Sequence, residues 1–200
     1  MGHIVGDWEI MMEETEILQS QCWKKAIYCF GTAYIFECRA RRLRLGLRII
    51  EFLGIIVPLF VGGIVTTYGI QFKHIQAILL LGGIVALAQL FTSVWALVSK
   101  WDDEYSYAQE SISANHDLSA RYRRFGENPP PRLEDFRMEV RFLDAEDSRR
   151  FDRDYRHGIS DQEKRKGMRA GLRSFGRECD GCKAIPKSMK PSQCPVCGDF

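Results

Sequence analysis

Four cysteines near the end of the sequence have the spacing of a metal site. Cys179 and Cys182 are separated by two residues, and after eleven further residues Cys194 and Cys197 repeat that spacing. Two residues between cysteines allow a tight turn to present both sulfurs to one ion, while backbone amides donate to the thiolates. Two such turns supply the four ligands of a closed tetrahedral site. We therefore expect a structural zinc ion that folds the tail and takes no part in catalysis.

Other uses of the cysteines stay open at this point. A redox-active CxxC pair normally occurs singly beside a strand and a helix, and an iron–sulfur cluster takes the same thiolate ligands as zinc. Three further cysteines, Cys22, Cys29 and Cys38, lie in a predicted amphipathic helix. Cysteine packs there as a small hydrophobe, and no histidine or acidic residue stands at ligand spacing beside them. We expect them to pack in a core, with redox activity as the alternative.

The rest of the chain has no arrangement typical of an active site. Its four histidines are scattered, with no serine, cysteine or acid arranged around them as a triad, and they are His3, His74, His116 and His157. A glycine-rich phosphate loop is also missing, so we expect the chain not to be an enzyme. Its 28 basic and 26 acidic residues are interspersed and give a net charge of +2. Charge alone therefore does not indicate direct binding of nucleic acid, which stays undecided.

Two long uncharged runs organise the elements that carry these cysteines. Residues 52–72 and 75–99 contain 21 and 25 residues without a charge, and only Lys73 and His74 separate them. At about 1.5 Å of rise per residue, either run is long enough to cross the roughly 30 Å hydrocarbon core of a bilayer as a helix. The sequence therefore predicts a hairpin of two transmembrane helices. Pairs of glycines at 62–63 and 82–83 would allow close helix packing within the hairpin or between copies.

The distribution of basic residues predicts the orientation of this hairpin. Five arginines precede the first run, at positions 39, 41, 42, 44 and 48, and Lys100 follows the second. The positive-inside rule then places both termini in the cytoplasm and the short 71–74 turn outside. In that reducing compartment the seven cysteines should be thiols or metal ligands. The arginines could also bind anionic lipid head groups, although the topology signal alone explains them.

Periodic apolar residues predict further helices on both sides of the hairpin. Residues 8–38 form one amphipathic helix, and another fits 132–156, with a buried stripe that Asp147 interrupts and that Phe151 and Tyr155 resume. Ser160 and Glu163 have the spacing of a capping box for a last helix. We predict an all-α fold: a two-helix transmembrane hairpin with long amphipathic cytoplasmic helices and a small four-cysteine zinc-knuckle tail. Its four parts are residues 1–48 (N-terminal helix and arginine-rich segment), 49–100 (hairpin), 101–176 (cytoplasmic helices) and 177–200 (zinc-binding tail).

Two resemblances add an expected function. The CxxCx(11)CxxC tail, with the segment 157–164 before it, resembles the bacterial mobilome CxxCx(11)CxxC proteins. The amphipathic helix, two spans and cytoplasmic helices over residues 8–156 resemble the SLATT group of two-span proteins. The resemblance implies an oligomeric effector in the bacterial inner membrane, which defends against phage or mobile elements. An operon-encoded sensor or nucleotide-synthesising partner would activate it to permeabilise the membrane. The alternative is a membrane-anchored adaptor whose helices and zinc tail recruit a defence enzyme.

Overall fold

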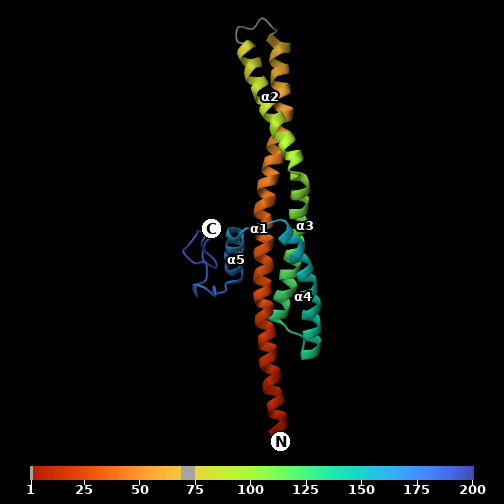
Figure 1. Cartoon of the computed structure of the whole chain (residues 1–200), viewed down its shortest axis with the longest axis vertical. Coiled ribbons are helices and arrows are strands. Elements are labelled where there is room, and N and C mark those ends of the chain that lie inside the picture. Colours follow the sequence, from red (N-terminus) through yellow and green to blue (C-terminus); the bar gives the residue numbers. More distant parts are fainter. Residues whose placement is uncertain (1, 69–74) are drawn as a thin grey trace. The chain divides into compact units, whose positions relative to one another are not determined.

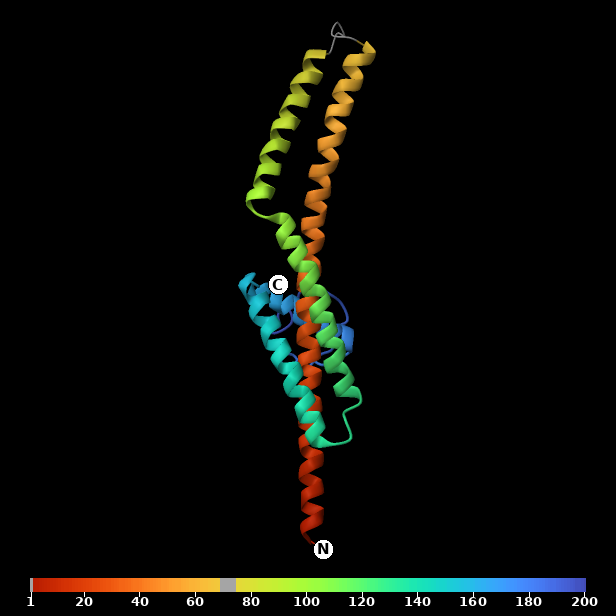
Figure 2. The same cartoon turned by 90° about the vertical axis from the view of Figure 1, so that its right-hand side faces the viewer.

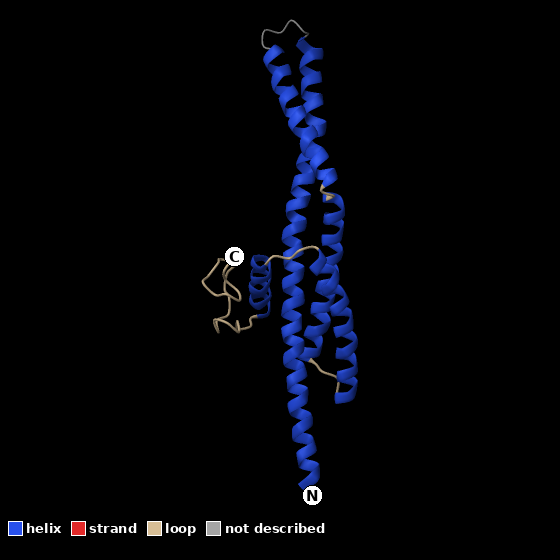
Figure 3. Ribbon diagram, viewed as in Figure 1, coloured by secondary structure: helices blue, strands red, loops and turns tan. Residues whose placement is uncertain are grey.

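The structure is a computed structural model that describes residues 2–68 and 75–200, and these residues are helical outside short loops and the C-terminal tail (Figure 3). Its helices are α1 (Gly2–Tyr68), α2 (Ile75–Val98), α3 (Trp101–Glu127), α4 (Leu133–Arg156) and α5 (Asp161–Phe175). The predicted all-α fold, with two long apolar helices and a cluster of four cysteines, is confirmed. The predicted turn with Lys73 and His74 lies outside the described residues.

The chain divides into two compact units, which are described separately below. The helical unit comprises Met1–Cys38 and Gln109–Phe200, and the hairpin unit comprises Arg39–Ala108. Helices α1 and α3 contribute residues to both units. The four-part division drawn from composition stays a prediction.

Helices α1, α3 and α4 form the core of the helical unit, and in Figure 2 they run alongside one another there. Buried residues recur three and four positions apart, which is the spacing of coiled-coil packing. On α1 they are Cys22, Ala26, Cys29, Ala33 and Phe36; on α4 they are Leu133, Phe136, Val140 and Leu143. The expected burial of Cys22 and Cys29 is thus confirmed.

The second half of α4 corrects one prediction. Phe151 and Tyr155 were expected to continue the buried stripe, but their exposed fractions are 64% and 63%. Arg150 and Asp154 are buried instead, with exposed fractions of 6% and 1%. The buried face keeps its alternating spacing of three and four residues beyond Leu143, and that spacing leads to polar side chains. Apolarity alone indicated the wrong face of the helix.

A hydrogen-bonded network makes the burial of Asp154 possible. Its carboxylate accepts hydrogen bonds from Ser111 Oγ at 2.8 Å and Asn115 Nδ2 at 2.7 Å, both on α3. Arg150 Nη2 donates to the same carboxylate at 2.8 Å and Nη1 donates to Glu110 at 2.7 Å. A buried charge is tolerated only when it is paired and hydrogen-bonded in this way. The network therefore joins α3 to α4 where apolar packing is interrupted.

Helix α5 packs on α1 through glycines, and Figure 1 shows it across α1 from α4. A Cβ added to Gly167 would come within 2.6 Å of the Gly31 carbonyl oxygen, and one added to Gly171 within 2.6 Å of the Ile27 carbonyl oxygen. The predicted capping box begins this helix, because Ser160 accepts from the Glu163 amide while the Glu163 carboxylate accepts from the Ser160 amide. Helix α5 leads directly into the four-cysteine tail.

The hairpin unit exposes large apolar side chains along both of its long helices. These include Ile55, Leu59, Phe60, Leu80, Leu81, Phe91, Trp95 and Leu97. The described part of α1 and the whole of α2 are long and apolar enough to cross a membrane. A polar contact joins the two helices, since Gln89 Nε2 donates to the Ile50 carbonyl oxygen at 3.4 Å. Of the predicted glycine pairs, Gly82 packs within the hairpin, since an added Cβ would lie 3.0 Å from Val61 Cγ2. A Cβ added to Gly62, Gly63 or Gly83 would meet no atom of the described residues within 4 Å.

Candidate metal centre

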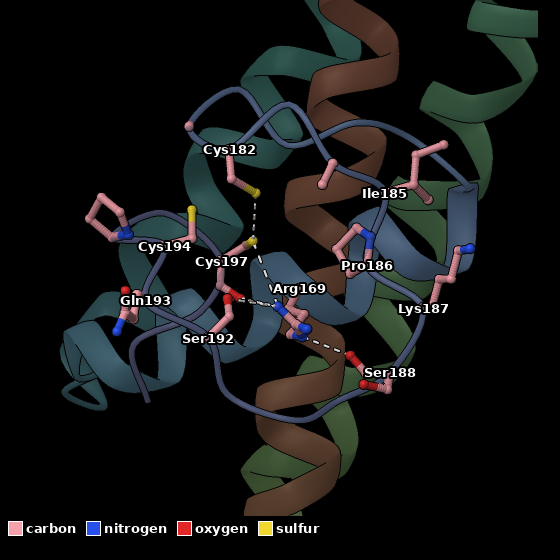
Figure 4. Close-up of a pocket in the computed structure, with 13 residues that line it drawn as sticks. Arg169, Cys182, Ile185, Pro186, Lys187, Ser188, Ser192, Gln193, Cys194 and Cys197 are labelled. Carbon is pink, nitrogen blue, oxygen red and sulfur yellow. Dashed lines mark hydrogen bonds between the residues drawn. The ribbon is translucent and has the colours of Figure 1, made fainter.

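The structure brings the four predicted ligands together. The sulfur atoms of Cys179, Cys182, Cys194 and Cys197 all lie within 4.8 Å of one another. Cys179 Sγ is 3.8 Å from Cys194 Sγ. Cys182 Sγ is 3.9 Å from Cys197 Sγ, and Figure 4 draws this second pair. Four sulfurs at about 2.3 Å from one zinc ion would stand about 3.8 Å apart at the corners of a tetrahedron. The spacing fits four thiolates around one ion and is far too long for a disulfide of about 2.05 Å.

Each CxxC pair is held by a backbone turn that points its sulfurs inward. The Cys179 carbonyl accepts from the Lys183 amide at 2.8 Å, and the Cys194 carbonyl accepts from the Gly198 amide at 2.9 Å. The two turns are thus alike, although they lie fifteen residues apart. Gly198 is required by the close approach of the chain, because an added Cβ would lie 2.5 Å from the Ser192 carbonyl oxygen. The two turns thus place the four sulfurs within reach of one ion.

In the absence of a cation, the electrostatics of the site favour the thiolate form of Cys194 and oppose that of Cys197. Backbone amides of Cys197 and Val196 donate toward Cys194 and lower the pKa of its thiol to about 7. Burial and the neighbouring sulfurs raise the pKa of Cys197, since four thiolates cannot crowd together without a compensating charge. A bound cation would supply that charge and keep all four sulfurs deprotonated. The residues could hold a metal ion, and a filled shell of four ligands leaves no open position for catalysis.

Arg169 of α5 is a further residue of the site that sequence reasoning missed. It is buried, its Nε donates to the Ser188 carbonyl at 2.7 Å, and its Nη1 donates to the Cys197 carbonyl at 3.2 Å and lies 3.9 Å from Cys197 Sγ (Figure 4). The guanidinium thus ties both halves of the tail to α5 and places a positive charge beside the sulfurs. No local signal marked Arg169, because its partners Ser188 and Cys197 lie 19 and 28 residues further along the chain.

Apolar residues form the base beneath the cluster. Ile27 of α1 and Leu172 of α5 pack with Cys179, Cys194 and Cys197, and Met168 and Phe175 border this group. Cys182 is the exposed member of the four ligands. Three of the four cysteines therefore pack against α1 and α5, and the fourth, Cys182, is exposed to solvent.

The remaining cysteines lie apart from this site. Cys22 and Cys29 are in the α1 core, and Cys38 is partly exposed. Burial, followed by the charge of Asp144, raises the pKa of Cys22 to about 11. Burial also raises the pKa of Cys29, whose Sγ donates to Asp147 Oδ1 at 3.5 Å. This acidic partner comes from α4, so local spacing on α1 could not indicate it.

Asp147 also explains the interruption in the α4 stripe. Its carboxylate accepts from Lys25 Nζ at 2.7 Å, and Tyr122 donates to the adjacent Asp144 at 2.6 Å. Burial lowers the pKa of Lys25, but its hydrogen bond to Asp147 and the charges of Asp147 and Asp144 outweigh that effect and raise the pKa overall. The polar position is thus a contact between α4 and α1.

Comparison with known proteins gives one match. A family model described as "Mobilome CxxCx(11)CxxC protein" matches residues 19–200. The match extends from α1 through both apolar helices to the cysteine tail. No curated protein and no solved structure matches the chain.

Proposed function

The chain belongs to the mobilome CxxCx(11)CxxC protein family, and we propose that it is a membrane effector of a bacterial conflict system directed against phage or mobile elements. The family supports an association with mobile elements. The SLATT-like order of an amphipathic helix, two apolar helices and further helices supports an effector role. In this proposal the chain performs no catalysis, and its action is on the membrane.

The surface of the hairpin unit is the observation that carries this proposal. Side chains such as Leu80, Phe91 and Leu97 are 66%, 73% and 79% exposed. Water does not favour such a continuous apolar surface, whereas hydrocarbon accepts it. This surface supports a hairpin that spans the bacterial inner membrane. The arginines before it and Lys100 after it support an orientation with both termini in the cytoplasm.

The small residues on the hairpin support oligomerisation. Gly62, Gly63 and Gly83 have open space where a Cβ would stand, so they do not serve packing within one hairpin. Glycines of this kind let helices of neighbouring copies approach closely in lipid. An oligomer of hairpins permeabilises the membrane when an operon-encoded sensor or nucleotide-synthesising partner activates it. The cytoplasmic helical unit, with zinc as the structural ion of its tail, receives that signal.

The second candidate function is a membrane-anchored adaptor. The contact between the cysteine tail and α5 favours it, because a rigid platform of this kind suits recruitment of a defence enzyme. In that case the hairpin serves only as an anchor, and its sequence should matter little beyond length and apolarity.

Exchange of the spans separates the two functions. Residues 52–98 are replaced by an unrelated two-span hairpin of equal length, and the operon is expressed during phage infection. A second variant keeps the native hairpin and replaces only Gly62, Gly63 and Gly83 by leucine. Membrane potential and dye entry are recorded together with phage yield. An effector should lose both permeabilisation and defence in either variant, whereas an adaptor should keep defence with the membrane intact.

A further inference from the structure

Three arginines on α1 of the hairpin unit form a basic stripe that the proposed function does not use. We propose that Arg41, Arg44 and Arg48 bind the head groups of anionic phospholipids. The inference rests on the proposed membrane insertion of the hairpin. It concerns which lipids surround the hairpin and how deep the hairpin lies.

The three arginines share one face of the helix. Their spacing of three and four residues places them one above another. Gly46 marks the opposite face, because a Cβ added there would lie 2.8 Å from the Trp101 ring of α3. At 3.6 residues per turn, Gly46 stands about 140–160° around the helix from each arginine. The stripe therefore points away from the part of the hairpin unit that packs against α1.

The charges of the stripe are available for an external partner. All three side chains are exposed, and within the described residues no ion pair involves them. Glu51 continues the same face toward the span and is also exposed. Three arginines and one glutamate leave the face with a net charge of +2. The other acidic residues of the hairpin unit, Asp102, Asp103 and Glu104, belong to α3, which packs on the opposite side.

The depth of the stripe matches the head-group layer. At 1.5 Å per residue, Arg48, Arg44 and Arg41 precede Phe52 by about 6, 12 and 16 Å along the axis. The polar layer of a bilayer is roughly 5–8 Å thick on each side, and a Debye length of about 8 Å extends its field. Arg48 and Arg44 can thus reach phosphates directly with their long side chains, and Arg41 lies within the surface field. Guanidinium groups bind phosphate oxygens through two parallel hydrogen bonds.

A second copy of the chain fits this face poorly. In a symmetric contact the same arginines would meet one another, and like charges placed together oppose association. A layer of anionic lipid instead offers many phosphates at the level that the arginines occupy. The opposite charge and the matching depth identify anionic phospholipid as the occupant.

Spin-labelled lipids test the inference on the full-length protein. The chain is reconstituted in phosphatidylcholine vesicles, and flotation with an alkaline wash first shows whether the hairpin is inserted. Association of spin-labelled phosphatidylglycerol is then compared with that of spin-labelled phosphatidylcholine. The wild type should prefer the anionic lipid about fivefold or more. The preference should fall with rising salt, because mobile ions screen the head groups.

Two variants complete the experiment. Replacing the stripe as Arg41→Gln, Arg44→Gln and Arg48→Gln should reduce the preference to about one, while the three lysine substitutions should retain most of it. The matched control changes three exposed arginines of α4 in the same way, namely Arg141, Arg149 and Arg156. A wild type without preference, or an equal loss in the control, overturns the inference. Failure of the wild type to insert overturns the proposed function instead, so the two failures are distinct.

Discussion

Gly31 of α1 and Gly167 of α5 lie with their backbones in direct contact. A Cβ on Gly31 would stand 2.7 Å from the Gly167 carbonyl oxygen, and a Cβ on Gly167 would stand 2.6 Å from the Gly31 carbonyl oxygen. Neither position has room for a methyl group unless one backbone moves. Because α5 also carries Arg169, this contact fixes the distance between the cysteine tail and α1.

The first prediction concerns Gly167→Ala. In an exposed helix, alanine in place of glycine stabilises by about 1 kcal/mol. Here the clash with the Gly31 backbone should reverse that sign and cost about 1–3 kcal/mol. Thermal unfolding of the detergent-solubilised chain, followed by circular dichroism, should show a lower midpoint. The control Ser174→Ala, on the exposed face of α5, should leave the midpoint unchanged, and a stabilised Gly167→Ala variant would contradict the close contact.

The features that could be predicted from the sequence depend on local signals. The long apolar runs, the cysteine spacing and the capping box of Ser160 each lie within a few neighbouring residues or one continuous segment. The bounds of α4 and the start of α5 follow from the same signals, so the all-α fold was accessible without a structure.

The features that could not be predicted depend on partners far apart in the sequence. Asp154 is buried only because Ser111 and Asn115 of α3 supply donors, and Cys29 meets Asp147 across 118 residues. In the same way, Arg169 looks like one more surface charge until the tail folds back onto it. The sequence around a polar residue does not show which distant residue will pair with it. Apolarity alone therefore wrongly predicted that Phe151 and Tyr155 would be buried.

The second prediction concerns the metal itself. Purified protein should contain about one zinc ion per chain, and Cys194→Ser should lose the ion and unfold the tail, because metal binding drives the folding of small thiolate sites. Elemental analysis gives the metal content, and limited proteolysis near residue 187 reports the folding of the tail. The control Cys38→Ser removes a cysteine outside the cluster and should keep the ion. Iron in place of zinc, or no metal, would refute the zinc assignment.

Arg169 gives the third prediction. Arg169→Met keeps the length of the apolar stem but removes the charge and the hydrogen bonds to Ser188 and Cys197. Loss of such an outer partner typically weakens metal affinity by 10–100-fold. Competition with a coloured chelator measures the affinity, and cobalt substitution reports the ligand geometry through its absorption bands. Arg173→Met, at an exposed position on the same helix, should have no effect, and equal affinities for both variants would count against the role of Arg169.

The fourth prediction uses the raised pKa of Cys22. An acid whose pKa rises from 9.0 to about 11 on folding stabilises the fold fully below pH 9, and that contribution is lost as the pH rises toward 11. The loss for this thiol is about 2–3 kcal/mol. The free energy of unfolding of the wild type should therefore fall more steeply between pH 9 and 11 than that of Cys22→Ala. Identical slopes would mean that the thiol is not buried, and Cys38→Ala serves as the matched cysteine control.

The last prediction compares two aspartates on α4. Asp154→Asn removes the anion that pairs with the buried Arg150 guanidinium, and an uncompensated buried charge typically costs 3–5 kcal/mol. Because the amide still accepts one hydrogen bond and Glu110 still contacts Arg150, we expect the lower end, about 3 kcal/mol. Asp152→Asn, two residues earlier on the exposed face, should change stability by less than about 0.5 kcal/mol. Chemical denaturation of both variants measures the difference. Equal stabilities would show that the polar network does not hold α3 against α4, and the apolar residues from Leu133 to Leu143 would then carry that contact alone.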